Sequence, residues 1–153
     1  MNRALHIFVW VLLGMAALAW GQGFTFTLGN PVAAQDFQFK SAAFVFRTEG
    51  CPEPEKLQIS SMAEGLVSGE RRSMTVRVIP TSKPGVYAIA QSWPREGKWV
   101  VTLKGVCGSQ TAGALVPVGP GGFSREAAKV FPRPATSGEI DAALKALTEG
   151  GKQ

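Results

Sequence analysis

The stretch that decides the fold is "PGVYAIAQSWPREGKWVVTLKG", residues 84–105. Two runs of alternating side chains, 86–93 and 98–105, surround a break of proline, glycine and charged residues. Alternation with a period of two is typical of β-strands that bury one face and expose the other. If the second run is continued to Cys107, that cysteine falls on the same apolar face as Trp99. We therefore expect both side chains to point into a core.

The same alternation recurs on both sides of this stretch. Examples are "AAFVFR" (42–47) and "SMTVRVI" (73–79), and a final strand is expected at "AGALVPV" (112–118). Short strands that follow one another about every 8 to 12 residues, with turn signals between them, indicate a sandwich. We expect an all-β fold, an immunoglobulin-like antiparallel β-sandwich of about seven strands, with a C-terminal α-helix. The break at 94–97 is interpreted as the turn of a hairpin.

The C-terminal segment has a helical pattern. Thr136 and Glu139 have the spacing of a capping box, and Gly150 follows the last periodic residue. Asp141 and Lys145 have the spacing of an ion pair on one helix face. The apolar stripe of this helix consists of Ile140, Ala143, Leu144 and Leu147. Before it, "FSREAAKVF" (123–131) is expected to form one or two helical turns, and "GPGG" (119–122) a linker.

The N-terminus has the features of a secretory signal peptide. Arg3 supplies a short positive region, and an apolar run from Ile7 to Trp20 follows it. This run has the length of a signal-peptide core and is shorter than the roughly 20 residues of a membrane span. Small residues allow cleavage after Ala34 or, alternatively, after residue 19 or 21. We expect cleavage after Ala34, because residues 21–31 are weakly patterned; an uncleaved anchor is the rival interpretation.

The predicted organisation is a signal peptide over residues 1–34, a β-sandwich over 35–119, and a linker with a helix over 120–153. Removal of the leader leaves no membrane span, so the mature protein is expected to be secreted or periplasmic. Cys51 and Cys107 are the only cysteines, and export places them in an oxidising compartment. No C-x-x-C motif is present, and the only histidine, His6, lies in the leader. We expect a structural disulfide between the two cysteines and neither a metal nor another cofactor.

Catalytic residues are not recognisable in the mature sequence. Without His6 no histidine can activate a serine, and nothing marks out a Ser-Lys dyad. Glu53 and Glu55 alternate in a proline-rich turn, where solvated side chains are a better interpretation than a glycosidase pair. We expect a non-enzymatic accessory or binding module. A small envelope hydrolase, an inhibitor of one, or a subunit that adds "FTFTLGN" (24–30) to a neighbouring sheet are the alternatives.

The formal net charge of +5 favours an anionic partner. Arg71-Arg72 is the only basic doublet, which is too sparse for a nucleic-acid interface. Trp99 is expected in the core, while Trp93, Pro94 and Arg95 form the expected contact surface. The partner is unknown; an envelope protein or an anionic envelope polymer fits the charge.

Five residues of the opening stretch carry a family resemblance. A Pro-Gly-x-Tyr strand (Pro84, Gly85, Tyr87) precedes a Gly-x-Trp strand (Gly97, Trp99). This pattern resembles secreted bacterial β-sandwich domains of the YtkA-like type over residues 84–105. The resemblance implies an exported accessory domain and, in some relatives, an association with metal handling. The mature sequence departs from the metal-handling pattern because it lacks histidine.

Overall fold

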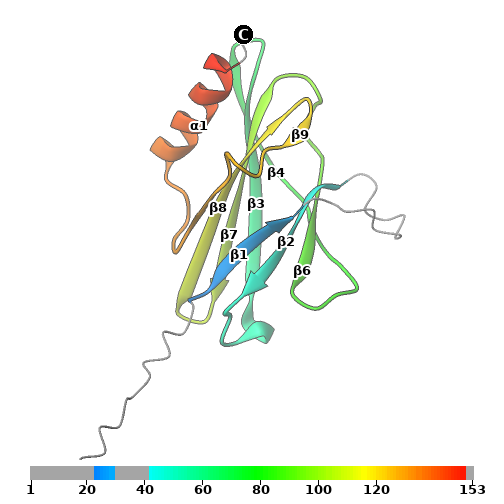
Figure 1. Ribbon diagram of the computed structural model, residues 1–153, viewed down its shortest axis with the longest axis vertical. Helices are drawn as coiled ribbons and strands as arrows, with labels where there is room; N and C mark the ends of the chain where they lie inside the picture. Colours follow the sequence, from blue (N-terminus) through cyan, green and yellow to red (C-terminus); the bar gives the residue numbers. More distant parts are fainter. Residues whose placement is uncertain (1–22, 30–41, 151–153) are drawn as a thin grey trace, which may run out of the picture.

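The structure, a computed structural model, describes residues 23–29 and 42–150. Two antiparallel β-sheets face each other, and a helix near the C-terminus covers the outer surface of one of them (Figure 1). This architecture confirms the predicted all-β sandwich with a C-terminal helix. The described residues form ten strands rather than about seven.

The first sheet has the strand order β1-β2-β6-β5 and the second the order β10-β8-β7-β3-β4, with β9 paired to β8. The strands of the first sheet are β1 (Thr25–Gly29), β2 (Ala42–Glu49), β5 (Val78–Pro80) and β6 (Val86–Ala90). Those of the second are β3 (Gln58–Val67), β4 (Glu70–Thr75), β7 (Lys98–Cys107), β8 (Gln110–Gly119), β9 (Gly122–Phe123) and β10 (Lys129–Phe131). A short 3-10 helix, η2 (Pro54–Lys56), lies between β2 and β3, and α1 (Ser137–Glu149) is the only α-helix of the described residues.

The core lies between the two sheets and follows the alternation of the sequence. Phe44 and Phe46 of β2 face Trp99, Val101 and Leu103 of β7, and each of these side chains is at most 1% exposed. The predicted inward face of residues 99–107 is therefore confirmed. Where β2 pairs with β6, the register shifts between Ala42 and Phe44.

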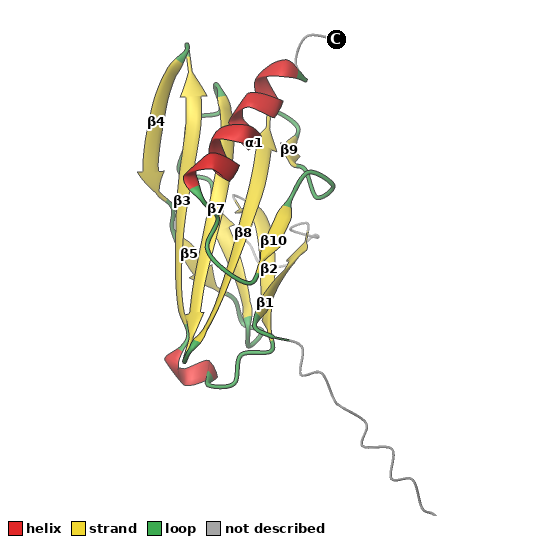
Figure 2. Ribbon diagram, turned by 90° about the vertical axis from the view of Figure 1, so that its left-hand side faces the viewer, coloured by secondary structure: helices red, strands yellow, loops and turns green. Residues whose placement is uncertain are grey.

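Helix α1 packs on the outer surface of the second sheet, as Figure 2 shows. Ile140 and Leu144 contact Val100 of β7 and Leu115 of β8, so both faces of these two strands are buried. The predicted capping box of Thr136 and Glu139 is present.

The predicted pairing of Asp141 with Lys145 is wrong. Asp141 accepts a hydrogen bond from Arg71 of β4 at 2.5 Å, and Lys145 pairs with Glu149. The spacing of residues along the helix could not show that Arg71, on a strand of the second sheet, lies within hydrogen-bond distance of Asp141.

Three connections differ from the prediction. Residues 91–97 carry the chain from β6 in the first sheet to β7 in the second, so this segment is a crossover and not a hairpin turn. The stretch 119–122 is the turn between β8 and β9 and not a linker. Residues 129–131 form β10 and not a helical turn. Strands of two or three residues carry too little alternation to be recognised, and alternation does not reveal which strand pairs with which.

Strand β1 belongs to the sandwich, although the prediction began the domain at residue 35. It pairs with β2 from Thr25 opposite Glu49 to Gly29 opposite Val45. The domain therefore extends beyond both predicted limits, 35 and 119, because β9 and β10 also belong to it. Most of the predicted leader, residues 1–22, and the expected cleavage position after Ala34 lie outside the described residues.

Candidate functional site

The two cysteines join the sheets at one end of the sandwich. Cys51 follows β2 of the first sheet, and Cys107 is the last residue of β7 in the second. Their sulfur atoms form a disulfide, with 5.7 Å between the Cα atoms, as predicted. Cys107 is completely buried, which is the environment of a structural rather than a reactive bridge.

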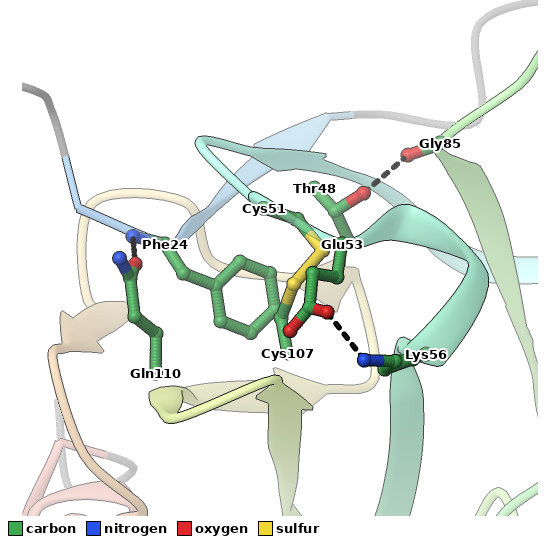
Figure 3. The surroundings of a disulfide bond; sticks show 8 residues. All are labelled: Phe24, Thr48, Cys51, Glu53, Lys56, Gly85, Cys107 and Gln110. Carbon is green, nitrogen blue, oxygen red and sulfur yellow. Dashed lines mark hydrogen bonds and ion pairs between the residues drawn. A yellow bond between two sulfur atoms is a disulfide. The ribbon is translucent and has the colours of Figure 1, made fainter.

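The surroundings of the disulfide are packed and their polar groups are paired (Figure 3). The ring of Phe24 lies beside the bridge, and its backbone N–H donates to Oε1 of Gln110 at 2.8 Å. The carbonyl oxygen of Gly85 accepts from the backbone N–H of Thr48 at 2.9 Å. This end of the molecule therefore holds the two sheets together.

Two acidic side chains, of which only Glu53 was weighed as a catalytic group, are engaged by cations. Glu53 forms an ion pair with Lys56, and Glu64 accepts two hydrogen bonds from the guanidinium of Arg71. The bond to Glu64, with a smaller contribution from Asp141, raises the pKa of Arg71. Residues 23–29 and 42–150 contain no group of three or more His, Cys, Asp or Glu side chains that could hold a metal ion.

An exposed ion pair between Arg133 and Glu139 lies at the start of α1. Both oxygens of Glu139 accept from Arg133, at 2.8 and 2.9 Å, and the backbone N–H of Thr136 donates to Glu139 at 2.8 Å. The bond from Arg133 is the main cause that lowers the pKa of Glu139 to about 2. This arrangement fixes the helix cap, which is a structural task.

A hollow of about 300 Å³ opens at the end of the sandwich opposite the disulfide. Its walls come from the first residues of β2 and β7, the crossover 91–97, and the turn between β8 and β9. Trp93 and Trp99 lie in its wall but are almost completely buried, and the exposed residues around it are Gln91, Pro94, Arg95, Pro120 and Gly122. The lining of the hollow is therefore of mixed polarity, and Arg95 is the one cation among its lining residues.

Only two of the three residues of the predicted contact surface are exposed. Pro94 and Arg95 are exposed at the rim, but Trp93 is only 4% exposed and belongs to the core, so its predicted surface position is wrong. The physical reason is the crossover, which takes Trp93 between the sheets instead of along the edge of a hairpin. Trp99 is buried as expected, and its indole N–H donates to the carbonyl oxygen of Glu96 at 2.9 Å.

The sequence prediction missed the contribution of the turn between β8 and β9. Gly119, Pro120 and Gly122 line the hollow, and their proline–glycine motif was visible but was interpreted as a linker. Across the described part of the chain no helix is long and apolar enough to cross a bilayer. The chain was compared with protein-family models, with curated proteins and with solved structures, and none of them matches.

Proposed function

We propose that this chain is an exported, non-catalytic binding module that works in the periplasm or outside the cell. The leader-like N-terminus and the disulfide support export, because disulfides persist in oxidising compartments. Glu53, one of the two carboxylates weighed as a glycosidase pair, is paired with Lys56, which agrees with a non-catalytic role. The YtkA-like resemblance of residues 84–105 agrees with an exported accessory domain.

The observation that carries the binding role is the hollow beside Arg95. The apolar part of its mixed lining, which includes Pro94 and Pro120, accommodates an apolar group, and the guanidinium at the rim favours a neighbouring carboxylate. Loss of Arg3 with the leader leaves a formal net charge of +4 (15 basic minus 11 acidic residues), which attracts an anionic partner over longer distances. These properties fit an acidic segment of an envelope protein that places an apolar side chain in the hollow.

The alternative in which residues 24–30 add a strand to a neighbouring subunit has less support. In the structure Thr25–Gly29 already pairs with β2 of its own chain, and the side chain of Arg125 holds the carbonyl oxygen of Leu28 at 2.7 Å. The strand that would be donated is thus used within the monomer. An anionic envelope polymer remains the competing partner, and salt dependence separates it from a protein.

Capture from envelope extract by the immobilised protein tests the proposal, with Gly119→Trp and Arg95→Glu as the informative variants. Gly119 lines the hollow, and a Cβ there has no heavy atom within 4 Å among the described residues, so a bulky side chain can be added at this wall without a clash at its Cβ. We expect both variants to lose a protein that the unmodified chain captures. Lys83→Glu, which changes an exposed cation outside the hollow, is the matched control and should retain it.

Equal capture by all of these proteins would contradict the proposed surface. A bound polymer would instead be released from every variant by about 1 M salt, because exposed charges are then screened within a few ångströms. A protein that also buries an apolar side chain in the hollow should remain bound under that condition.

A further inference from the structure

We infer that the chain is cleaved on the N-terminal side of Phe24, after Ala19 or Gly21, and that β1 stays in the mature protein. This inference rests on the proposed export, which brings the chain to a membrane-bound signal peptidase, an endopeptidase. The enzyme hydrolyses one peptide bond with one water molecule. A carboxylate forms on Ala19 or Gly21, and a free amine forms on Trp20 or Gln22.

The first argument is the burial of the side chains of β1 and of the residue before it. Phe24 and Phe26 are each 3% exposed and Leu28 is 7% exposed. The rings of Phe24 and Phe26 lie edge to face at 5.5 Å, and Phe26 meets Phe46 of β2 at 5.3 Å. These side chains are part of the common core of both sheets, so a cut after Ala34 would remove a strand from that core.

The second sheet is shaped to receive these rings. A Cβ at Gly105 of β7 would come within 2.7 Å of ring atoms of both Phe24 and Phe26. Only a residue without a side chain leaves room for two aromatic rings at this position. Gly105 of β7 therefore leaves the space that the rings of Phe24 and Phe26 fill.

The backbone of this strand is held on both of its edges. One edge pairs with β2, and residues 24, 26 and 28 direct their backbone groups toward the other edge. On that second edge Phe24 N–H donates to Gln110 at 2.8 Å, and Nη2 of Arg125 donates to the carbonyl oxygen of Leu28 at 2.7 Å. Both partners are distant in sequence. Because the bonded region begins at Phe24, the cut must fall before this residue.

The sequence offers suitable peptide bonds only a few residues upstream. Ala17 and Ala19 form a small-x-small motif, and Ala19 and Gly21 form a second one. Ala19 is shared by both motifs, so a single bulky substitution there, Ala19→Phe, removes both. The matched substitution Ala34→Phe removes only the downstream site and leaves the two upstream motifs unchanged.

Intact mass of the full chain, expressed with its own leader and recovered without reductant, tests the inference. We expect a first residue of Trp20 or Gln22. A first residue of Gln35, or a full-length chain outside the cytoplasm, would overturn the inference and leave the proposed export standing. A full-length chain kept in the cytoplasm with free thiols would overturn both together.

The two variants give an independent readout. For Ala34→Phe we expect normal processing and a mature mass raised by the difference between alanine and phenylalanine, because residue 34 is retained. For Ala19→Phe we expect loss of processing and accumulation of the precursor. The opposite pattern, in which only Ala34→Phe blocks processing, would place the cut after residue 34 and refute the inference.

Discussion

The indole ring of Trp99 lies directly against Gly65, its cross-strand neighbour on β3. Gly65 and Trp99 are register partners, and a Cβ at Gly65 would lie closer than 3.0 Å to three atoms of the indole. The indole N–H is at the same time held by the carbonyl oxygen of Glu96. Gly65→Ala must therefore displace the largest buried side chain of the core or bend a central strand, and we expect a loss of about 1–3 kcal/mol in the free energy of unfolding.

Chemical denaturation followed by tryptophan fluorescence measures this loss. Gly138→Ala is the matched control, because a Cβ at Gly138 meets no described heavy atom within 4 Å and alanine favours a helix. This control should be neutral or slightly stabilising. If Gly65→Ala were equally neutral, the close packing of the indole on β3 would be refuted.

Among substitutions that leave the composition of the core almost intact, removal of the disulfide is expected to lower the free energy of unfolding the most. Cys51 and Cys107 are separated by 56 positions and lie in different sheets. Closing a loop of this length restricts the unfolded chain, and the chain-entropy relation gives about 4 kcal/mol of stabilisation. The double variant Cys51→Ser, Cys107→Ser should therefore unfold at a much lower denaturant concentration than the oxidised protein.

Reductant separates this effect from the change of side chains. Dithiothreitol should lower the midpoint of the unmodified protein toward that of the double variant and should leave the double variant unchanged. An unmodified protein whose midpoint does not respond to complete reduction would show that the bridge contributes little.

The parts of the fold that could be predicted are those fixed by neighbours in sequence. The inward position of Trp99 and Cys107 follows from a period of two along one strand. The start of α1 follows from Thr136 and Glu139, which are three residues apart and contact each other directly. In both cases the deciding contacts, or the deciding periodicity, lie within a few residues.

The parts that could not be predicted depend on contacts between distant segments. The burial of Phe24 in the core depends on Gly105 and Gln110. The strand that follows Phe24 is only five residues long and comes shortly after the apolar run 7–20, so the sequence does not mark it as part of the sandwich. The burial of Trp93 depends on the crossover between sheets, which alternation alone cannot distinguish from a hairpin. The hollow was missed for the same reason, since its walls come from three separate segments, residues 42–43, 91–99 and 118–122.

Acid should weaken the cap of α1 over a defined range of pH. The pKa of Glu139 is lowered from 4.5 to about 2, mainly by the hydrogen bond from Arg133 and then by the backbone N–H of Thr136. A folded-state pKa below the unfolded value means that the charged carboxylate stabilises the fold above pH 4.5. This contribution is lost as the pH falls from about 4.5 to about 2.

An NMR titration of the Glu139 carboxyl carbon measures this pKa. Arg133→Ala should raise it toward the ordinary value, because the largest cause of the shift is removed. Lys129→Ala removes an exposed cation from β10 and should leave the midpoint in place. A midpoint near the ordinary value in the unmodified protein would contradict the bidentate pair.

The hydroxyl of Ser61 is expected to cost stability. Ser61 is 3% exposed on β3, and its Oγ has no hydrogen-bond partner among the described residues. A buried hydroxyl that gives up its bonds to water without replacing them carries a penalty of about 1–3 kcal/mol, so Ser61→Ala should raise the free energy of unfolding by about 1 kcal/mol. The backbone bond from Val76 N–H to the Ser61 carbonyl, at 3.0 Å, does not involve the side chain and should persist. Ser60→Ala, on the exposed face of the same strand, is the control and should change the free energy of unfolding by less than about 0.5 kcal/mol. If Ser61→Ala instead lowered the free energy of unfolding, the Ser61 hydroxyl would have a hydrogen-bond partner in the folded protein, and the prediction would be wrong.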